Sequence, residues 1–321
     1  MATQAPTLPT GDSRTRRTPP RLLRRVRDHA ADYLYVAPAI LVMLVVIGYP
    51  LVYTIYRSFF FTDARDPDWT WNSIHNYTGI LSDHLFWRVT WNTVIWTVGS
   101  TALSVVLGFG AAMVLHREFI GRGLLRGILL IPWVISAVAA AYIWKWMLHS
   151  DYGLISNQLM AWGWIDRPFI VLDDRSRALG GLIFVNVWKE FPFVMIMVMA
   201  GLQTVPQQLL RAARVDGAST WSQFIHITMP HLKGVLLITT LLLAVTNLNS
   251  FTLPYLMTGG GPANSSQLWI TEIYKISFGA GLRYGEASAY SVILFLFMAF
   301  IGYFYVRALT SGGAKKEGEA R

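Results

Sequence analysis

Six long apolar stretches alternate with shorter polar segments along the chain. A helix needs roughly 20 mainly apolar residues to cross a hydrocarbon layer about 30 Å thick, and each stretch reaches that length. The pattern therefore predicts an all-α, polytopic integral membrane protein with six transmembrane helices. The predicted spans are about 33–56, 87–115, 124–148, 178–202, 234–258 and 287–309.

Lys and Arg residues are concentrated on one side of these predicted spans. They gather in the N-terminal tail, in the loops after the second and fourth spans, and in the C-terminal tail. Because cytoplasmic loops carry an excess of Lys and Arg, this distribution predicts that both termini are cytoplasmic. The net charge of +9 then reflects topology and attraction to lipid headgroups. It does not indicate nucleic acid binding, because the basic residues lie in separate clusters.

Composition excludes several other classes of protein. Only 14% of the residues are charged, against about a quarter in a typical soluble domain, which again indicates a membrane protein. The absence of Cys excludes disulfides, thiol nucleophiles and Cys-based metal sites. The sequence contains no G-x-x-x-x-G-K-[ST] run to cradle a nucleotide phosphate and no paired-carboxylate site or catalytic triad. It therefore predicts neither an enzyme nor a cofactor bound by this chain.

Two polar tails flank the predicted membrane domain, 33–309. Residues 1–32 are rich in Thr, Pro and Arg, which is typical of a basic, largely disordered cytoplasmic tail. Residues 310–321 form a second, shorter cytoplasmic tail. Three external segments are too short for separate domains but long enough to present a surface to a receptor, namely 57–86, 149–177 and 259–286.

One cytoplasmic loop, 203–233, interrupts the apolar pattern with a structured polar segment. Pro206 suits the first turn of a helix, where its missing N–H group costs nothing, and the helix is expected to run to about Val215. Gly217 follows Asp216 at the position of a left-handed C-cap. The loop therefore begins with a short helix that ends in a sharp corner.

A second short helix is predicted after this corner. Ser219 or Thr220 caps its beginning, and Pro230 helps to end it before the fifth span. Such a loop can simply lie on the lipid headgroups, but helices in that layer usually bury bulky apolar residues. Here the first helix and the corner offer small side chains, which favours close docking by another protein: Ala212, Ala213 and Ala218.

The loop resembles a known sequence pattern. It reads A-A-x-x-D-G-A-x-x-W-x-x-F-x-x-I-x-x-P, which is similar to the EAA, or coupling, loop of binding-protein-dependent ABC importer permeases of the maltose and glycerol-3-phosphate type. The resemblance covers about residues 33–309. Five further stretches support it, in this order: VAPAILVMLVVIGYPLVYTIYRSF (36–59), HNYTGIL (75–81), VWKEFPF (187–193), AGLQTVP (200–206) and SFTLPYLMTGGGP (250–262).

The resemblance implies the type I ABC importer permease fold and a transport subunit in the plasma (inner) membrane. It implies three kinds of partner: two ABC ATPase subunits that bind ATP and Mg, a second homologous permease, and an extracytoplasmic sugar-binding protein. The implied cargo is a carbohydrate, such as a disaccharide or oligosaccharide, carried by alternating access. The loop helix is expected to fit a cleft on the ATPase through Arg211, Ala212, Ala213, Asp216, Gly217 and Ala218.

The match to the family pattern fails at the first residue of the motif. The family's glutamate is replaced by Arg211, which reverses the charge and removes the ion pair that the glutamate would form. We interpret this contact as weakened or re-partnered, for example with a carboxylate of the ATPase. Docking itself is expected to persist, because Pro206, the alanines and the Asp216–Gly217 corner preserve the helix geometry.

Polar and aromatic residues near the middle of the fourth and fifth spans form a candidate substrate path. Sugars are held by aromatic faces and by amide or carboxylate groups, and ionisable residues at this depth usually face a cavity. Neighbouring helical residues point about 100° apart, so Lys189 and Glu190 are not both expected to face one cavity. By the same geometry, only one of Asn247 and Asn249 is expected to line it. Glu190, Trp188 and Asn249 are the preferred cargo contacts; alternatively, these groups satisfy each other or join neighbouring helices.

Two prolines lie at a similar depth in the same spans. Pro192 and Pro254 are expected to break regular helical hydrogen bonding there. Broken helices are tolerated in membranes where the backbone lines a cavity. The prolines therefore favour a cavity at this level.

The residues alone leave open two other functional classes of membrane protein. An ion-coupled secondary sugar transporter needs intramembrane carboxylates, for which the Lys189–Glu190 pair is the candidate. A membrane glycosyltransferase needs acidic or metal-binding residues clustered at one interface, and the external acids of this chain form no such cluster.

Overall fold

The computed structural model describes residues 30–63, 66–279 and 281–318. The chain divides into two compact units, Met1–Tyr53 and Thr54–Arg321. The tail predicted at 1–32 lies almost wholly outside the described residues. Residues Tyr35–Arg57 form a helix of 23 residues that is long and apolar enough to cross a membrane. Its elements are α2 (Ala30–Met43), the π-helix η1 (Leu44–Gly48) and α3 (Tyr49–Arg57).

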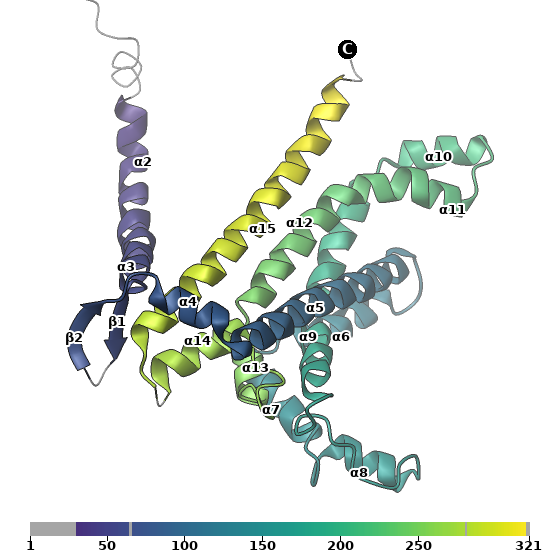
Figure 1. Ribbon diagram of the computed structural model, residues 1–321. Helices are drawn as coiled ribbons and strands as arrows, with labels where there is room; N and C mark the ends of the chain where they lie inside the picture. Colours follow the sequence, from purple (N-terminus) through teal and green to yellow (C-terminus); the bar gives the residue numbers. More distant parts are fainter. Residues whose placement is uncertain (1–29, 64–65, 280, 319–321) are drawn as a thin grey trace, which may run out of the picture. The chain divides into compact units, whose positions relative to one another are not determined.

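The second unit consists of helices and one β-hairpin (Figure 1). Five described helices of the chain are long and apolar enough to span a membrane, or six if the bent pair α6 and α7 forms one span. This agrees with the predicted helical fold. The helical elements of the second unit are α4 (His75–Ser82), α5 (His84–His116), α6 (Arg122–Val134), α7 (Ala137–Met147), α8 (Leu154–Ala161), α9 (Ala178–Gln203), α10 (Gln207–Val215), α11 (Thr220–Gln223), the π-helix η2 (Phe224–Thr228), α12 (Met229–Leu248), α13 (Thr252–Met257), α14 (Trp269–Phe278) and α15 (Tyr284–Gly318).

The β-hairpin lies in the segment 57–86, where the sequence predicted no strand. Its strand β1 (Phe60–Asp63) pairs antiparallel with β2 (Asp66–Trp71). Phe60 lies opposite Trp71, and their rings meet edge to face with centroids 5.1 Å apart. Cross-strand aromatic pairs of this kind stabilise a hairpin by roughly 0.2–1 kcal/mol. The strands are short and lie close to the first apolar span. The alternation of hydrophobic and polar residues that marks a strand is therefore not distinct in the sequence.

The third predicted span, 124–148, is not one straight helix. It consists of α6 and α7, whose axes are bent by 95°. Ile135 and Ser136 have extended backbone angles between them, so the helical hydrogen bonding stops at this point. Hydropathy alone does not register such a bend, because both halves are equally apolar.

The fifth predicted span, 234–258, was wrong at both ends. A continuous helix runs over Thr220–Leu248 and includes Pro230, which was expected to end a separate helix. The π-helix η2 precedes this proline, and the N–H group of Met229 bonds the carbonyl of Phe224, five residues back. A proline ring clashes with the carbonyl four residues before it in a regular α-helix. The wider turn shifts that carbonyl and allows the helix to continue.

The predicted proline breaks are also corrected by the structure. Pro192 lies inside α9, which continues to Gln203. The interruption in the fifth span lies at residues 249–251, between α12 and α13. Pro254 lies in the first turn of α13, where its missing N–H group is tolerated. The helix therefore breaks before this proline and not at it.

The packing centre of the second unit is the contact between α5 and α9. Ala112 and Leu115 of α5 are fully buried in one apolar cluster with Val194 and Val198 of α9. Gly108 permits the close approach of these helices. A Cβ atom at this position would lie only 2.5 Å from the Cβ atom of Val194, well inside van der Waals contact.

Replacing Gly108 with Val is expected to destabilise the second unit, because the added side chain must push α5 away from α9. Overpacking of this kind typically costs about 1–3 kcal/mol, so the Tm of the purified protein in detergent should fall. Gly110→Val is the matched control on the same helix, since nothing lies within 4 Å of a Cβ atom at Gly110. Equal Tm values for the two variants would contradict this account.

Candidate functional site

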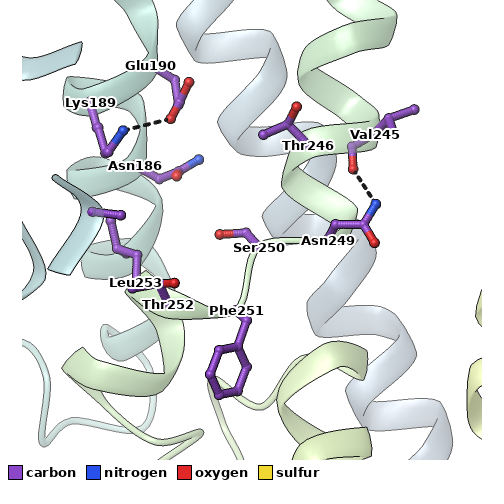
Figure 2. Close-up of a pocket in the computed structure, with 11 residues that line it drawn as sticks. Asn186, Lys189, Glu190, Val245, Thr246, Asn249, Ser250, Phe251, Thr252 and Leu253 are labelled. Carbon is purple, nitrogen blue, oxygen red and sulfur yellow. Dashed lines mark hydrogen bonds and ion pairs between the residues drawn. The ribbon is translucent and has the colours of Figure 1, made fainter. Parts of the chain in front are cut away.

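A polar cavity of about 460 Å³ lies between α9 and the end of α12. Figure 2 shows Asn186, Lys189 and Glu190 on α9 at one side of the cavity and Thr246 and Asn249 on α12 at the other. These residues lie near the middle of α9 and near the end of α12. The cavity therefore brings together the two polar patches that the sequence placed in the fourth and fifth spans.

The link between α12 and α13 closes one side of this cavity. Ser250 and Phe251 lie in the non-helical link and line the cavity together with Thr252. Non-helical backbone at membrane depth is tolerated where it lines a cavity or is buried in protein. Sequence reasoning named Asn249 in this run but missed Phe251. The signal available for it was an aromatic residue directly after the Asn-Ser step.

The ion pair of the cavity corrects one sequence prediction. The Nζ atom of Lys189 lies 3.3 Å from Oε1 of Glu190, and their side chains are only 14% and 16% exposed. Both residues line the cavity, although their Cα–Cβ bonds diverge on the helix. The prediction that they do not share one cavity was wrong. Both side chains are long enough to turn toward each other, and pairing offsets the cost of removing each charge from water.

Asn247 and Asn249 have different surroundings. The Oδ1 atom of Asn247 accepts a hydrogen bond from Asn186 at 2.8 Å, and its Nδ2 atom donates to Thr101 Oγ1 at 3.0 Å. Trp96 Nε1 donates to the backbone carbonyl of Asn247 at 3.0 Å. Asn247 is therefore buried between three helices and does not line the cavity, whereas Asn249 does. The expectation that only one of this pair faces a given cavity agrees with the structure.

Trp188 does not line this cavity either. Its ring meets that of Trp144 edge to face, with centroids 5.3 Å apart, and it packs against a hydrophobic cluster that includes Leu182 and Val185. It therefore faces α7, on a side of α9 away from Glu190. Its aromatic face made it a candidate for contact with a sugar, but the apolar contacts with α7 account for its position.

The polar loop that follows α9 forms a segment with the predicted shape. We call residues 207–228 the coupling segment; it comprises α10, α11 and η2. Gly217 has a φ angle of +78°, the left-handed conformation expected for the C-cap after α10. Ser219 Oγ accepts a hydrogen bond from the N–H group of Ser222 at 3.2 Å and caps α11. The corner and both caps are confirmed.

The residues predicted to contact an ATPase lie on this segment with unequal exposure. Arg211, Ala212 and Asp216 are exposed, whereas Ala213 and Ala218 are half-buried against the rest of the loop. No ion pair joins Arg211 to another residue that the structure describes. One face of α10 is thus open to a partner of the chain.

The ionisable groups of the described ranges do not gather as metal ligands. No cluster of three or more His, Asp or Glu side chains is found there. Outside the spans, the pKa of the Asp174 carboxyl is lowered, because Ser176 donates to it from its hydroxyl and from its backbone N–H group at 2.6 and 2.7 Å. These bonds order the turn from which α9 begins.

The chain was compared with known protein families. Residues 104–310 match the family described as "Binding-protein-dependent transport system inner membrane component", and this range is more than half of the chain. The chain belongs to this family. It is therefore a permease subunit and a multi-pass protein of the inner membrane, as the coupling loop indicated.

Several similar proteins are named as sugar permeases. The permease is 32% identical over 290 residues to the trehalose/maltose transport system permease protein MalF of Thermococcus litoralis, with 88% of this chain and 95% of the relative covered. It is 32% identical over 300 residues to the trehalose transport system permease protein SugA of Mycobacterium tuberculosis, with 92% and 93% covered. It is also 32% identical over 287 residues to the sulfoquinovosyl glycerol transport system permease protein SmoG of Agrobacterium fabrum, with 88% and 91% covered.

Solved structures support the fold. The permease matches a chain in the crystal structure of a bacterial ABC transporter involved in the import of the acidic polysaccharide alginate, with a TM-score of 0.74 and 21% identity. The match covers 90% of the permease and 99% of that chain. A chain in the crystal structure of a bacterial alginate ABC transporter in complex with an alginate pentasaccharide-bound periplasmic protein gives a TM-score of 0.75. The type I importer permease fold is confirmed.

The two asparagines should respond differently to substitution. Asn247→Leu is expected to lower the Tm of the permease in detergent, because it removes hydrogen bonds to Asn186 and Thr101. Such bonds between membrane helices contribute about 0.6–2 kcal/mol. Asn249→Leu should leave the Tm close to that of the wild type, since the Asn249 amide bonds a carbonyl of its own helix. A larger loss for Asn249→Leu than for Asn247→Leu would contradict the assigned surroundings.

Proposed function

We propose that this permease carries a neutral carbohydrate through the cavity between α9 and α12 as part of an ATP-driven importer. In this proposal an extracytoplasmic binding protein delivers the sugar, and a second, homologous permease forms the other half of the path. Two ATPase subunits close on ATP at the cytoplasmic side, and the cavity alternates between the two faces of the membrane. Both termini are placed in the cytoplasm, in line with the distribution of Lys and Arg.

The observation that carries the proposal is the chemistry of the cavity. Carbohydrates present hydroxyl groups and apolar ring faces, and binding sites combine a few placed polar groups with aromatic contacts. The cavity offers the amide of Asn249, the hydroxyls of Thr246 and Ser250 and the carboxylate of Glu190, and Phe251 contributes to its wall. Trehalose and maltose, the sugars in the names of two of the relatives, are neutral and have the same chemical character.

The charges of the cavity favour a cargo without net charge. Lys189 and Glu190 pair with each other, and no other ionisable residue among those that the structure describes lines the cavity. A charged sugar acid would have to break this pair or enter beside it, which leaves one charge uncompensated in a poorly hydrated site. A disaccharide or oligosaccharide without carboxylates needs no such rearrangement.

The coupling segment is the proposed contact with the ATPase. Arg211, Ala212 and Asp216 are exposed on it, and small side chains permit close approach of another backbone. Ala213, Gly217 and Ala218 complete the proposed contact by setting the shape of the corner. Arg211 has a positive charge where the family pattern has a carboxylate, so we propose that it pairs with an acidic residue of the ATPase.

Gly217→Pro is expected to abolish uptake and co-purification of the ATPase subunits. Proline fixes φ near −65°, which is incompatible with the φ of +78° at this corner, so α10 and α11 can no longer keep their arrangement. The measurement is the amount of ATPase that co-purifies with the tagged permease from membranes.

Gly163→Pro is the matched control for this experiment. Gly163 also has a positive φ, +70°, and like Gly217 its N–H group bonds a carbonyl three residues back. The control substitution therefore imposes similar strain outside the coupling segment. It should leave ATPase co-purification at the wild-type level. Equal co-purification of the ATPase with both variants would remove the coupling assignment.

Glu190→Gln should raise the KM for cargo uptake about tenfold or more, because hydrogen bonds to charged groups contribute about 1.5–3 kcal/mol and the substitution leaves Lys189 unpaired. Uptake of radiolabelled trehalose and maltose would be measured in vesicles with the complete transporter and its binding protein. Glu118→Gln removes a carboxylate from an exposed loop residue and serves as the control. Unchanged uptake kinetics in Glu190→Gln would exclude this carboxylate from the cargo site.

A further inference from the structure

A second cavity, of about 330 Å³, lies on the inner side of the coupling segment. Its walls come from the ends of α5 and α9 and from α10, α11 and η2. Gln207, Leu210 and Arg214 line it from α10 and share one face of that helix, since residues three and four apart lie side by side. Arg211 and Ala212, the proposed ATPase contacts, do not line it. The cavity therefore lies behind the proposed docking face.

The ionisable groups of this cavity are all basic. His116 and Arg117 line it from the end of α5, and Arg214 lines it from α10. No carboxylate lines the cavity, and neither guanidinium forms an ion pair with any residue that the structure describes. Thr220 and Gln223 add polar side chains. The cavity therefore has the electrostatic character of an anion site.

The remaining walls are apolar. Leu202 near the end of α9 and Val205 in the link to α10 are 3% and 4% exposed, and Phe224 lines the cavity from η2. The ring of Phe224 also meets that of Phe109 of α5, with centroids 6.1 Å apart. A free phosphate ion gains nothing from contact with these apolar walls. An amphiphile, with a phosphate group beside a hydrocarbon chain, matches both kinds of surface.

We propose that this cavity binds the headgroup and first acyl carbons of an anionic phospholipid. Its phosphate would lie between Arg117 and Arg214, and its glycerol and acyl carbons against Leu202, Val205 and Phe224. α5 and α9 are both long and apolar enough to cross a membrane, and the proposal places their ends in the headgroup layer. The choice of the cytoplasmic leaflet, which carries the anionic lipids, rests on the proposed orientation of the permease.

Each arginine also has a local role. Arg117 follows the last residue of α5, and Arg214 lies in the last turn of α10, where positive charge stabilises the negative end of a helix. Stabilising a helix end does not require that both guanidinium groups line the same cavity. Nor does it require that this cavity lack a carboxylate. A lipid in this position would support the coupling segment from behind and leave its outer face to the ATPase.

The site can be tested by photocrosslinking in the assembled transporter. The complete complex would be reconstituted in phosphatidylcholine nanodiscs with a small fraction of phosphatidylglycerol that carries a diazirine near its headgroup. Mass spectrometry should place crosslinks on residues 113–117 and 202–224. The same diazirine on phosphatidylcholine should label these peptides at least about fivefold less. Equal labelling by the two lipids, or no labelling of these peptides, would overturn the proposal.

Paired variants test the role of charge. The double variant Arg117→Gln with Arg214→Gln should reduce the labelling at least about tenfold, since one basic residue near an anionic surface changes affinity by about fivefold. Arg122→Gln with Lys233→Gln removes two charges that do not line the cavity and should leave the labelling unchanged. Similar labelling in both double variants would contradict the site.

Two further experiments distinguish the lipid from other possible occupants of the cavity. Excess inorganic phosphate should not displace the labelled phosphatidylglycerol; displacement would indicate a soluble anion and overturn the lipid assignment. If the peptides are labelled only after the ATPase subunits are removed, the ATPase occupies the cavity and the proposal fails. All arms measure crosslinking and not uptake, so this test can fail while the proposed transport function stands, and the reverse.

Discussion

The hydrogen bonds of Asn247 are the constraint on which the arrangement of the second unit depends. Its side chain joins α12 to α9 through Asn186 and to α5 through Thr101, and its carbonyl accepts a bond from Trp96. Polar groups in hydrocarbon find no water, so each one must find a partner in the protein. Satisfying Asn247 in this way brings three helices together just before α12 ends, and the cavity forms beside that point.

The cavity follows from this arrangement. Once α12 is held against α5 and α9, its next polar residue, Asn249, is turned away from the buried network and toward the opening. The chain then leaves the helix for three residues, 249–251, before α13 begins. The cavity therefore has amide, hydroxyl and backbone groups on one wall and the Lys189–Glu190 pair on the other. The same sequence run supplies both a structural asparagine and a candidate cargo contact.

Many features of this structure were predictable from the sequence. The predictions that failed concern features that depend on the three-dimensional surroundings of a residue. Length and apolarity predicted a helical membrane protein, and local chemistry predicted the left-handed turn at Gly217 and the cap of α11, because these depend on neighbouring residues alone. The bend between α6 and α7 and the continuity of the helix through Pro230 depend on how a local backbone defect is absorbed. The direction of Trp188 depends on Trp144, a neighbour that sequence does not reveal. The angle between side chains on a helix predicted correctly that Asn247 and Asn249 face different surroundings. The same angle gave a wrong prediction for Lys189 and Glu190, because their long side chains reach around the helix.

The unbroken helix over Thr220–Leu248 has a mechanical consequence. At 1.5 Å per residue, its 29 residues form a rod about 43 Å long, with the coupling segment at one end and the wall of the cavity at the other. The π-helix η2 lets this rod pass Pro230 without a break, so it contains no hinge. A tilt applied at Thr220 would therefore displace Asn249 in proportion, as in a lever, and the next interruption of the helix lies in the link to α13.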